Sequence, residues 1–203
     1  MAVIVKADII TDVNENLQLG LAAGSTDLDR AIIKTLTDMS NRGLLVGTDA
    51  TQTLVDGSTT LAYPTGFRKG GVINITLIDG SGVEKTPLIK LRGGHQEYRE
   101  LRHNDNTSGV TEEYSEFNKQ FFLWRPANQA YTTLIEYRKN HAKDADSIEF
   151  ETEFESLMFA GTTFWKAIAT KRTSSIAIWS PMYDREMSAA VANRNIQPGI
   201  VGG

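Results

Sequence analysis

The stretch FFLWRPANQAYTTLIEYRKN, residues 121–140, is the most aromatic and most β-prone part of the chain, and it decides the expected fold. Its two apolar arms flank a polar segment that begins with a proline, a composition typical of a strand, a turn and a second strand. In the second arm, every other side chain belongs to one face of a strand: Tyr131, Thr133, Ile135 and Tyr137. The stretch therefore predicts an antiparallel hairpin, and none of its residues forms a catalytic pattern.

Residues 44–140 as a whole have a strand-like composition and no helical periodicity. Within them, GVINITLID (residues 71–79) alternates apolar and polar side chains, as a half-buried strand does. An Asp-Gly pair then marks a tight turn, because glycine accepts the positive φ that such turns require. The segment EKTPLIKL, residues 84–91, is expected to return as a second strand. Residues 92–109 are expected to form a loop, or a short helix followed by a loop.

Two helices are predicted before the β region. The first spans residues 8–17, whose apolar positions recur at about one-turn spacing. The second begins near Leu28, after the Ser-Thr-Asp run at residues 25–27, which offers three possible N-cap side chains. It is expected to stop at Gly43, because glycine commonly ends a helix.

An acidic run at residues 144–155 precedes a second helical region. Apolar residues recur at three- and four-residue steps over residues 150–168, which predicts a long amphipathic helix. Carboxylates are stabilised by the positive end of a helix dipole, so this explanation of the acidic run is preferred to a metal site. Ser180 followed by Pro181 signals another helix start, and a short helix is expected to reach about Asn193.

These patterns predict an α+β fold in which a helical domain carries an inserted antiparallel β region. The helical domain comprises residues 1–43 and 144–203, with two helices near its beginning and a long helix near its end. The β-rich domain comprises residues 44–143. The last nine residues, NIQPGIVGG, have no helical or strand period, so they are expected to form a loose tail.

The composition is ordinary for a soluble globular protein and excludes several kinds of chemistry. Of the 203 residues, 40% are hydrophobic and 23% are charged. There is no apolar run near the ~20 residues that span a bilayer and no secretory signal pattern, so no membrane association is expected. Without cysteines the chain has no disulfide or thiol nucleophile, which fits assembly in a reducing compartment. A net charge of -4 gives no global attraction for nucleic acid.

No pattern in the sequence points to catalysis, a cofactor or a metal ion. His95 and His103 are eight residues apart, too far to share one ion on a helix. The glycine-rich segments match no phosphate loop, and no nucleophile elbow is present. The only dense basic patch comprises Lys90, Arg92, Arg99 and Arg102. Acidic residues are interleaved with it, which favours a mixed salt-bridge surface, and we expect the chain not to be an enzyme.

Three stretches carry a resemblance to a known family: LAYPTGFRKGGVINITL (residues 61–77), EEYSEFNKQFFLWRPANQAYTTLIEYRKN (112–140) and EFESLMFAGTTFWKAIATKR (153–172). They resemble the Tyr-Pro-x-x-Phe segment and strand, the two strands around a proline, and the following helix of the head-to-tail adaptor (connector) proteins of tailed bacteriophages. The likeness spans about residues 8–172. It departs from the family at His141-Ala142, where a proline usually follows the second strand.

The resemblance implies a structural protein of the virion neck, between capsid and tail, that is assembled in the host cytoplasm. Copies of such a protein, commonly twelve, form a ring beneath the portal protein. The ring joins the DNA-filled head to downstream neck or tail proteins and lets DNA pass without sequence-specific binding. An acidic balance suits this role because it does not attract the phosphate backbone. No catalytic, cofactor-binding or metal-binding residue is implied.

Five residues are expected to lie at protein interfaces. Trp124, Tyr131 and Tyr137 are expected to contact another subunit or another virion protein, because aromatic side chains fill pockets on a partner. Ile200 and Val201 in the tail are expected to dock on the portal, or second on a neighbouring subunit. The alternative for the tail is a frayed terminus without a partner.

The residues leave two other functions open. One is a β-rich binding module for a glycan or a receptor, in a virion or a cell-surface assembly. The other is an enzyme of unrecognised type. A binding module would keep its aromatic side chains on a solvent face with a pocket, a ring subunit would bury them against a copy of itself, and an enzyme would show a cleft with a perturbed acid-base group.

Overall fold

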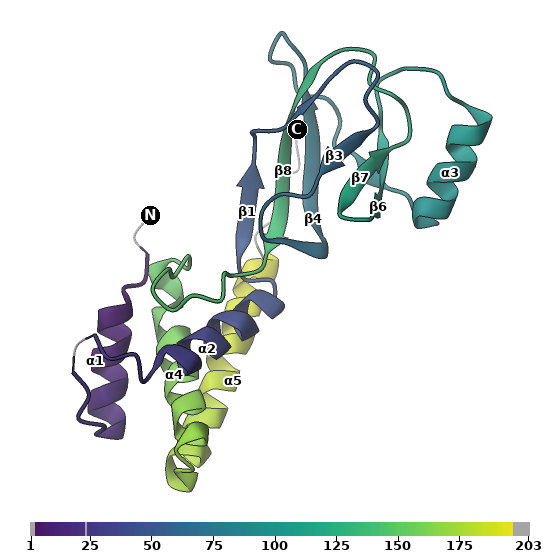
Figure 1. Cartoon of the computed structure of the whole chain (residues 1–203). Coiled ribbons are helices and arrows are strands. Elements are labelled where there is room, and N and C mark those ends of the chain that lie inside the picture. Colours follow the sequence, from purple (N-terminus) through teal and green to yellow (C-terminus); the bar gives the residue numbers. More distant parts are fainter. Residues whose placement is uncertain (1–2, 23, 197–203) are drawn as a thin grey trace. The chain divides into compact units, whose positions relative to one another are not determined.

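The computed structural model describes residues 3–22 and 24–196, except the side chains of residues 195 and 196 (Figure 1). The chain divides into two compact units: unit 1 contains Met1–Leu45 and Asn140–Gly203, and unit 2 contains Val46–Lys139. Within the described residues, unit 1 is helical, and unit 2 holds two sheets and one helix. The predicted α+β class is therefore confirmed.

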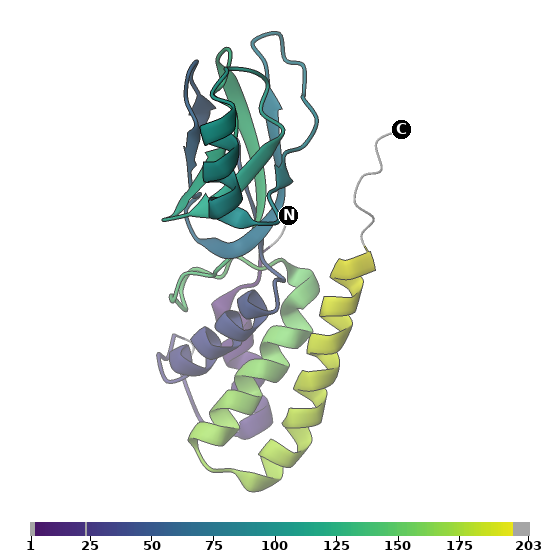
Figure 2. The same cartoon turned by 90° about the vertical axis from the view of Figure 1, so that its right-hand side faces the viewer.

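Unit 1 is built around α4 (Glu155–Ala169), which follows a 3-10 turn, η1 (Thr152–Phe154). This helix packs against α1 (Lys6–Leu17), α2 (Asp29–Asn41) and α5 (Thr173–Ile196). Figure 2 shows α4 and α5 side by side and running in opposite directions. Apolar residues at one-turn spacing give each helix a side that meets a common core. That core includes Ile9, Val13, Ile32, Leu36, Met39, Leu157, Met158, Trp179 and Tyr183.

The ends of α2 lie close to the predicted positions, but its start is not capped as predicted. Leu28 is the N-cap residue, and no side chain bonds to the first turn. The hydroxyl of Ser25 instead accepts the backbone N–H of Asp27, at 3.2 Å. At the other end, Gly43 has a φ of 78° and donates its N–H to the carbonyl of Ser40 at 2.9 Å. Glycine ends the helix there because a positive φ costs it little.

The acidic run does not form the first turns of α4, contrary to the prediction. The helix begins only at Glu155, so most of the run lies in an irregular segment before it. In that segment the carbonyl of buried Phe150 accepts the N–H of Ile4 at 3.1 Å. Asp146 also forms an ion pair with Lys6 at 2.5 Å. Contacts with the first residues of the chain therefore hold this segment in a non-helical conformation.

The helix α5 continues through Pro181, where the sequence predicts a new helix to begin. Proline inside a helix loses one hydrogen bond and costs about 3 kcal/mol. Trp179, Tyr183 and Met187 lie one turn apart on the side of α5 that joins the core, and all three are buried. Burial stabilises each such side chain by about 1.5–3 kcal/mol, so together they outweigh the cost of the proline.

In unit 2, the first sheet is centred on β8 (Tyr131–Lys139). One edge of β8 pairs with β4 (Phe67–Ile78), and the other pairs with β1 (Val46–Asp49) and β2 (Thr53–Leu54), all antiparallel. The alternating residues of β8 are buried on one face, as their spacing predicts: Tyr131, Thr133, Ile135 and Tyr137.

The second sheet has the order β3 (Thr60–Ala62), β7 (Gln120–Leu123), β6 (Glu113–Phe117) and β5 (Ile89–Lys90). The β5–β6 pair is parallel, and the other pairs are antiparallel. Both sheets contribute to one core, which includes Ile75, Leu77 and Ile135 from the first sheet and Leu61, Tyr114, Phe121 and Leu123 from the second. The helix α3 (Gly94–Asn104) packs against β6 and β7, and lies in front of the strands in Figure 2.

The two arms of the stretch at residues 121–140 are strands, but they do not form the predicted hairpin. β7 pairs with β3 and β6, whereas β8 pairs with strands of the other sheet. Between them, buried Ala127 donates its N–H to the carbonyl of Ser58 at 2.9 Å and accepts the N–H of Gly57 at 2.8 Å. The connection therefore pairs with residues that precede β3, and this pairing separates the two arms.

The segment after β4 also differs from the predicted returning strand. Glu84 forms an isolated bridge with Ile78, and Leu88 donates its N–H to the carbonyl of Ile75 at 2.8 Å. Pro87, between them, has no N–H to continue a ladder. The chain then leaves β4, and β5 joins the second sheet.

Candidate functional site

The surface formed by α3 and the second sheet is the candidate functional site. Along β6, Tyr114 is buried in the core of unit 2, so Ser115 takes the opposite face. Phe122 of β7 is directly opposite Ser115, and Phe117 lies two residues further along β6. Because opposed residues share a face, Ser115, Phe117 and Phe122 all face the side on which α3 packs.

Aromatic rings hold α3 on this face. The His95 ring stacks on Phe117 with 4.2 Å between ring centroids and 9° between planes, and on Tyr98 with 5.1 Å and 20°. Phe122 meets the His95 ring edge-on at 4.8 Å. The side-chain nitrogen Nδ1 of His95 lies 3.4 Å from the hydroxyl of Ser115. The helix is therefore positioned by stacked rings.

These rings remain partly open to solvent. No residue of α3 is fully buried, and the Phe117 side chain at the edge of the stack is 52% exposed. An open hollow of about 1100 Å³ is lined by Phe117 and by α3 side chains such as Tyr98 and Arg99. Its volume is near the upper end of the roughly 300–1,000 Å³ of typical small-molecule pockets, and it is open to solvent.

Ile89 adds a second exposed apolar side chain to the same face. It is opposite Glu113 in the parallel β5–β6 pair, which places it on the face that Ser115 and Phe117 share. The Ile89 side chain is 65% exposed. Exposed apolar side chains that gather on one face are more informative than scattered ones.

The charges at this surface are mixed, as predicted, but among the described residues no ion pair joins its arginines to its carboxylates. Among the described residues, Arg92, Arg99 and Arg102 have no ion-pair partner, and one buried nitrogen of Arg102 has no hydrogen-bond partner. The carboxylates interleaved with these arginines accept hydrogen bonds from groups in or next to α3. Glu97 accepts the N–H of the glycine that precedes α3 at 2.8 Å, and Glu100 accepts a glutamine amide one turn earlier at 3.3 Å. The surface therefore carries arginines without ion-pair partners beside carboxylates that accept only neutral donors.

The pKa of His95 is lowered from its ordinary value, first because burial disfavours the charged ring and second because Arg99 is nearby. The neutral imidazole is thus favoured in the stack, and it can lie against Phe117 without carrying a charge into the contact.

The opposite face of β6 is fixed by a buried carboxylate. The Glu116 side chain is 4% exposed and forms an ion pair with Lys90 at 2.6 Å. It also accepts the N–H of Gly70 at 3.0 Å. Burial and the neighbouring Glu116 raise the pKa of Tyr63 to about 12. These bonds join β5, β6 and β4, so the strands that carry Ile89 and Phe117 are held in place.

Trp124 lies beside this surface. It follows Phe122 by two residues, and the Arg125 guanidinium lies 4.6 Å from the centre of its ring. Arg125 also pairs with Asp105, just beyond α3, at 3.2 Å. The Trp124 indole nitrogen is buried and has no hydrogen-bond partner among the described residues. An interface role for half-buried Trp124 stays a prediction.

Tyr131 and Tyr137 lie in the core of unit 2, which does not fit a contact with another chain. Their exposed fractions are 2% and 5%. The Tyr131 hydroxyl donates to Asn128 at 2.7 Å, and the Tyr137 hydroxyl donates to the carbonyl of Thr65 at 3.0 Å. Both rings face inward because β8 is central in its sheet and this face covers the core. Ile200 and Val201 lie outside the described residues.

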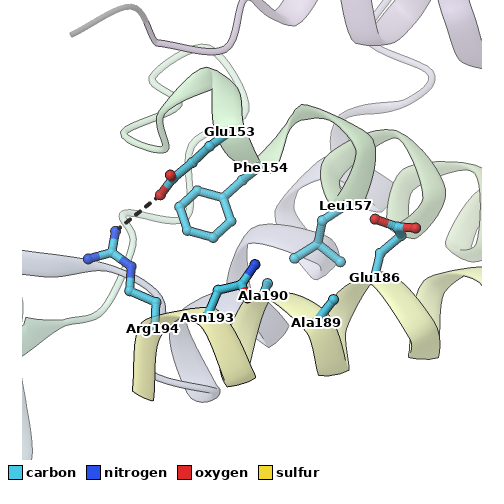
Figure 3. A pocket seen from close by; sticks show the side chains of 8 residues that line it. All are labelled: Glu153, Phe154, Leu157, Glu186, Ala189, Ala190, Asn193 and Arg194. Carbon is cyan, nitrogen blue, oxygen red and sulfur yellow. Dashed lines mark ion pairs between the residues drawn. The ribbon is translucent and has the colours of Figure 1, made fainter. Parts of the chain in front are cut away.

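Unit 1 contains a smaller groove between the start of α4 and the end of α5 (Figure 3). Its volume is about 170 Å³, and Phe154, Leu157 and Ala190 line its apolar part. Arg194 closes one end, 3.8 Å from Glu153 and 5.4 Å from the centre of the Phe154 ring. Its volume is below that of typical ligand pockets, so the α3 surface remains the stronger candidate.

Within the described ranges, no three His, Cys, Asp or Glu side chains are grouped so that they could hold a metal ion. His95 and His103 lie near opposite ends of α3. His141 has a structural role: its backbone N–H donates to Ser40 at 3.0 Å, and its ring accepts the N–H of Glu149 at 3.1 Å. The helices in the described part are too short or too polar to cross a membrane.

Ile89 and Phe117 are not singled out by the sequence patterns. One local signal could have located Phe117: it precedes Asn118 and Lys119, which have φ values of 46° and 60°. Asparagine tolerates a positive φ and commonly begins such a two-residue hairpin turn. The turn fixes the register of β6 against β7 and so places Phe117 on the face opposite the core.

The fold and this surface define a two-unit α+β protein whose β unit carries an open surface of aromatic rings and mixed charges. No family model matches the chain, and no curated protein matches it.

Proposed function

We propose that the chain is a structural head-to-tail connector of a tailed phage virion. In this role, copies form a ring beneath the portal protein, join the head to downstream neck or tail proteins and leave a channel for DNA. The protein belongs to the virion neck, is assembled in the host cytoplasm and has no catalytic activity.

One observation carries this proposal: a β unit is inserted between α2 and α4 of a helical unit that both ends of the chain build. The resemblance to phage connectors implies this arrangement. The resembling stretches also supply much of the packing. Tyr63 and Phe67 of the Tyr-Pro-x-x-Phe segment both contact the ring of Phe121, at 4.8 and 5.3 Å between centroids.

The charge distribution supports a protein that DNA passes without binding. Unit 1 contains 14 Asp and Glu residues against 10 Lys and Arg residues, whereas unit 2 contains 11 of each. Neither unit has the basic excess that accompanies binding to the phosphate backbone.

Light scattering and negative-stain imaging of the purified chain, alone and with portal rings of its phage, test the proposal. We expect a closed ring with a central hole, whose mass is a whole multiple of the 22.4 kDa chain. A mass of one chain at all protein concentrations, with no binding to portal rings, would contradict it.

A β-rich module that binds a glycan or a receptor is the second candidate function. It is favoured by the half-exposed Phe117 ring beside an open hollow, because such a ring offers a flat apolar face. This candidate predicts a monomer that binds sugars in a calorimetric titration and loses that binding in Phe117→Ala. A closed ring without sugar binding favours the connector.

A further inference from the structure

The α3 face of unit 2 has the composition of an interface core with a charged rim. We define it by two exposed apolar residues and two arginines of α3: Ile89, Phe117, Arg99 and Arg102. The apolar pair is 65% and 52% exposed, and the arginines have no ion-pair partner within the described residues. Arginine and aromatic residues are enriched at protein interfaces, where each guanidinium can bond a carboxylate in two places.

Unit 1 carries a face of matching composition and opposite charge. We define this acidic face by Val3, Val5, Asp144, Asp146 and Glu151. Val3 and Val5 are each 53% exposed, while Ile4 between them is buried. The chain between residues 143 and 153 contains one lysine and five carboxylates.

Backbone and side-chain contacts hold the parts of the acidic face together. Val3 forms an antiparallel bridge with Glu151. Asp146, whose side chain is 76% exposed, reaches Lys6, the residue after Val5. The Asp144 carboxylate accepts the N–H of Asp146 at 3.0 Å. The two valines are therefore bordered by carboxylates, as Ile89 and Phe117 are bordered by arginines.

We propose that the α3 face of one copy binds the acidic face of the next copy. Both faces have an exposed apolar pair. The arginines of the α3 face, which have no ion-pair partner within the described residues, can pair with the carboxylates of the acidic face, and the contact covers the apolar side chains of both. The two faces are different surfaces of one chain, so the contact is head-to-tail and repeats from copy to copy. The closure of that series into a ring rests on the proposed connector function.

Charge reversal at each face tests this contact. The α3-face variant is Arg99→Glu with Arg102→Glu, one exposed and one half-exposed residue of α3, and the acidic-face variant is Asp144→Arg with Glu151→Arg. We expect each variant alone to associate at least about tenfold more weakly, because like charges then meet across the contact. The matched control is Arg185→Glu on α5, which reverses an exposed charge outside both faces and should not change association.

Mixing the two variants gives the sharpest result. Each retains one intact face, so the acidic face of one binds the α3 face of the other. The two altered faces also complement each other, with their charges exchanged, so we expect the mixture to assemble as alternating copies of the two variants, with a mass in sedimentation that is a whole multiple of the 22.4 kDa chain and matches the wild-type assembly. Assembly of the mixture, when neither variant assembles alone, also shows that both variants are folded. A chain that carries all four substitutions should assemble again, because its two faces are complementary with their charges exchanged.

Three outcomes separate this contact from the connector function. If the wild-type chain forms rings and both variants also form them, the contact is wrong, the connector proposal stands, and another occupant covers the α3 face. If assembly depends on both faces but gives only open chains, with portal rings present, the contact is right and the ring function is wrong. If the wild-type chain does not associate under any condition, both are wrong.

Discussion

At the scale of single residues, Gly161 marks the closest approach in the core of unit 1. A Cβ atom there would lie 2.5 Å from Cγ2 of Thr35 in α2 and 2.7 Å from Cε2 of Tyr183 in α5. The missing side chain lets α4 lie between the two helices. These helices are also joined through Asp38, which accepts the Tyr183 hydroxyl and the Trp165 indole N–H, each at 3.2 Å.

Gly161→Ala is expected to lower the free energy of unfolding by about 1–2 kcal/mol in urea titrations. Overpacking costs about 1–3 kcal/mol, which exceeds the gain of up to about 1 kcal/mol from helix propensity. Gly80→Ala is the control: no atom lies within 4 Å of its Cβ position, and we expect a change within about 0.5 kcal/mol. If Gly161→Ala stabilised the protein, α2 and α5 would be able to move away from α4 without a loss of free energy.

Phe154→Ala is expected to cost about 3–5 kcal/mol, the range for a fully buried aromatic side chain. Phe154 is 5% exposed, and its ring meets Phe150 edge-on at 5.7 Å. Ile178→Ala on α5, where the side chain is 59% exposed, should change the free energy of unfolding by less than about 0.5 kcal/mol. If both variants lost a similar free energy of unfolding, the burial of Phe154 would not explain the cost of its removal.

At the scale of secondary-structure elements, α5 shows packing that overrides a local signal. Its 24 residues include Pro181, and its buried side chains follow one another at one-turn steps across the proline. Pro181→Ala should therefore stabilise unit 1 by about 1–3 kcal/mol, because it restores an N–H and a better helix former. Chemical denaturation measures this change. If the substitution lowered the free energy of unfolding, Pro181 would be stabilising. That result would favour a new helix that begins after Ser180, because proline is favourable at the first position of a helix.

The stability of unit 2, which contains α3, should depend on pH because of His95. The folded-state pKa of His95 lies below the ordinary 6.5, so the unfolded chain binds more protons as the pH falls below about 6.5. The contribution of neutral His95 to the free energy of unfolding of unit 2 is therefore fully present above that pH. It is lost as the pH falls through the folded-state pKa. Urea unfolding between pH 5 and 8 measures this loss.

His95→Phe is the matched variant for that experiment. It keeps a ring that can stack on Phe117 but removes the titrating group, so the part of the pH dependence due to His95 should disappear. An NMR titration gives the pKa of His95 directly. A value above 6.5 in the folded protein would contradict the prediction.

At the scale of the whole molecule, the two units have separate cores, and unit 2 begins and ends at one place in its sheet. Val46 is directly opposite Arg138 in the β1–β8 pair, so the two ends of unit 2 are about 5 Å apart. An insertion with adjacent ends can be removed without stretching the chain that receives it.

We expect residues 46–139 to fold as an isolated protein, and unit 1 to fold when a short Gly-Ser linker joins residues 45 and 140. Each should unfold in one cooperative transition, measured by circular dichroism and amide hydrogen exchange, because each contains its own core. If neither piece folds, the two units depend on each other for stability.

The α3 and acidic faces show how far local patterns locate a candidate site. Arg92, Arg99 and Arg102 are recognisable in the sequence as a basic patch, and the acidic run is equally visible. Their exposed apolar partners are not, because Ile89 and Val3 are ordinary strand and terminal residues in a linear pattern. Each becomes part of a face only through pairing, of β5 with β6 and of Val3 with Glu151.

The sequence by itself determined the helices of α1 and α2, the strand character of β4 and β8, and the buried face of β8. Each depends on a period of two or 3.6 residues, which neighbouring side chains set locally. The tertiary structure alone decided which strands pair, why β7 and β8 enter different sheets, and why α5 continues through Pro181. It also decided that Tyr131 and Tyr137 fill a core. The spacing of apolar residues indicates which side of a helix or strand is buried. It does not indicate which element covers that side, because that element lies far away in the sequence.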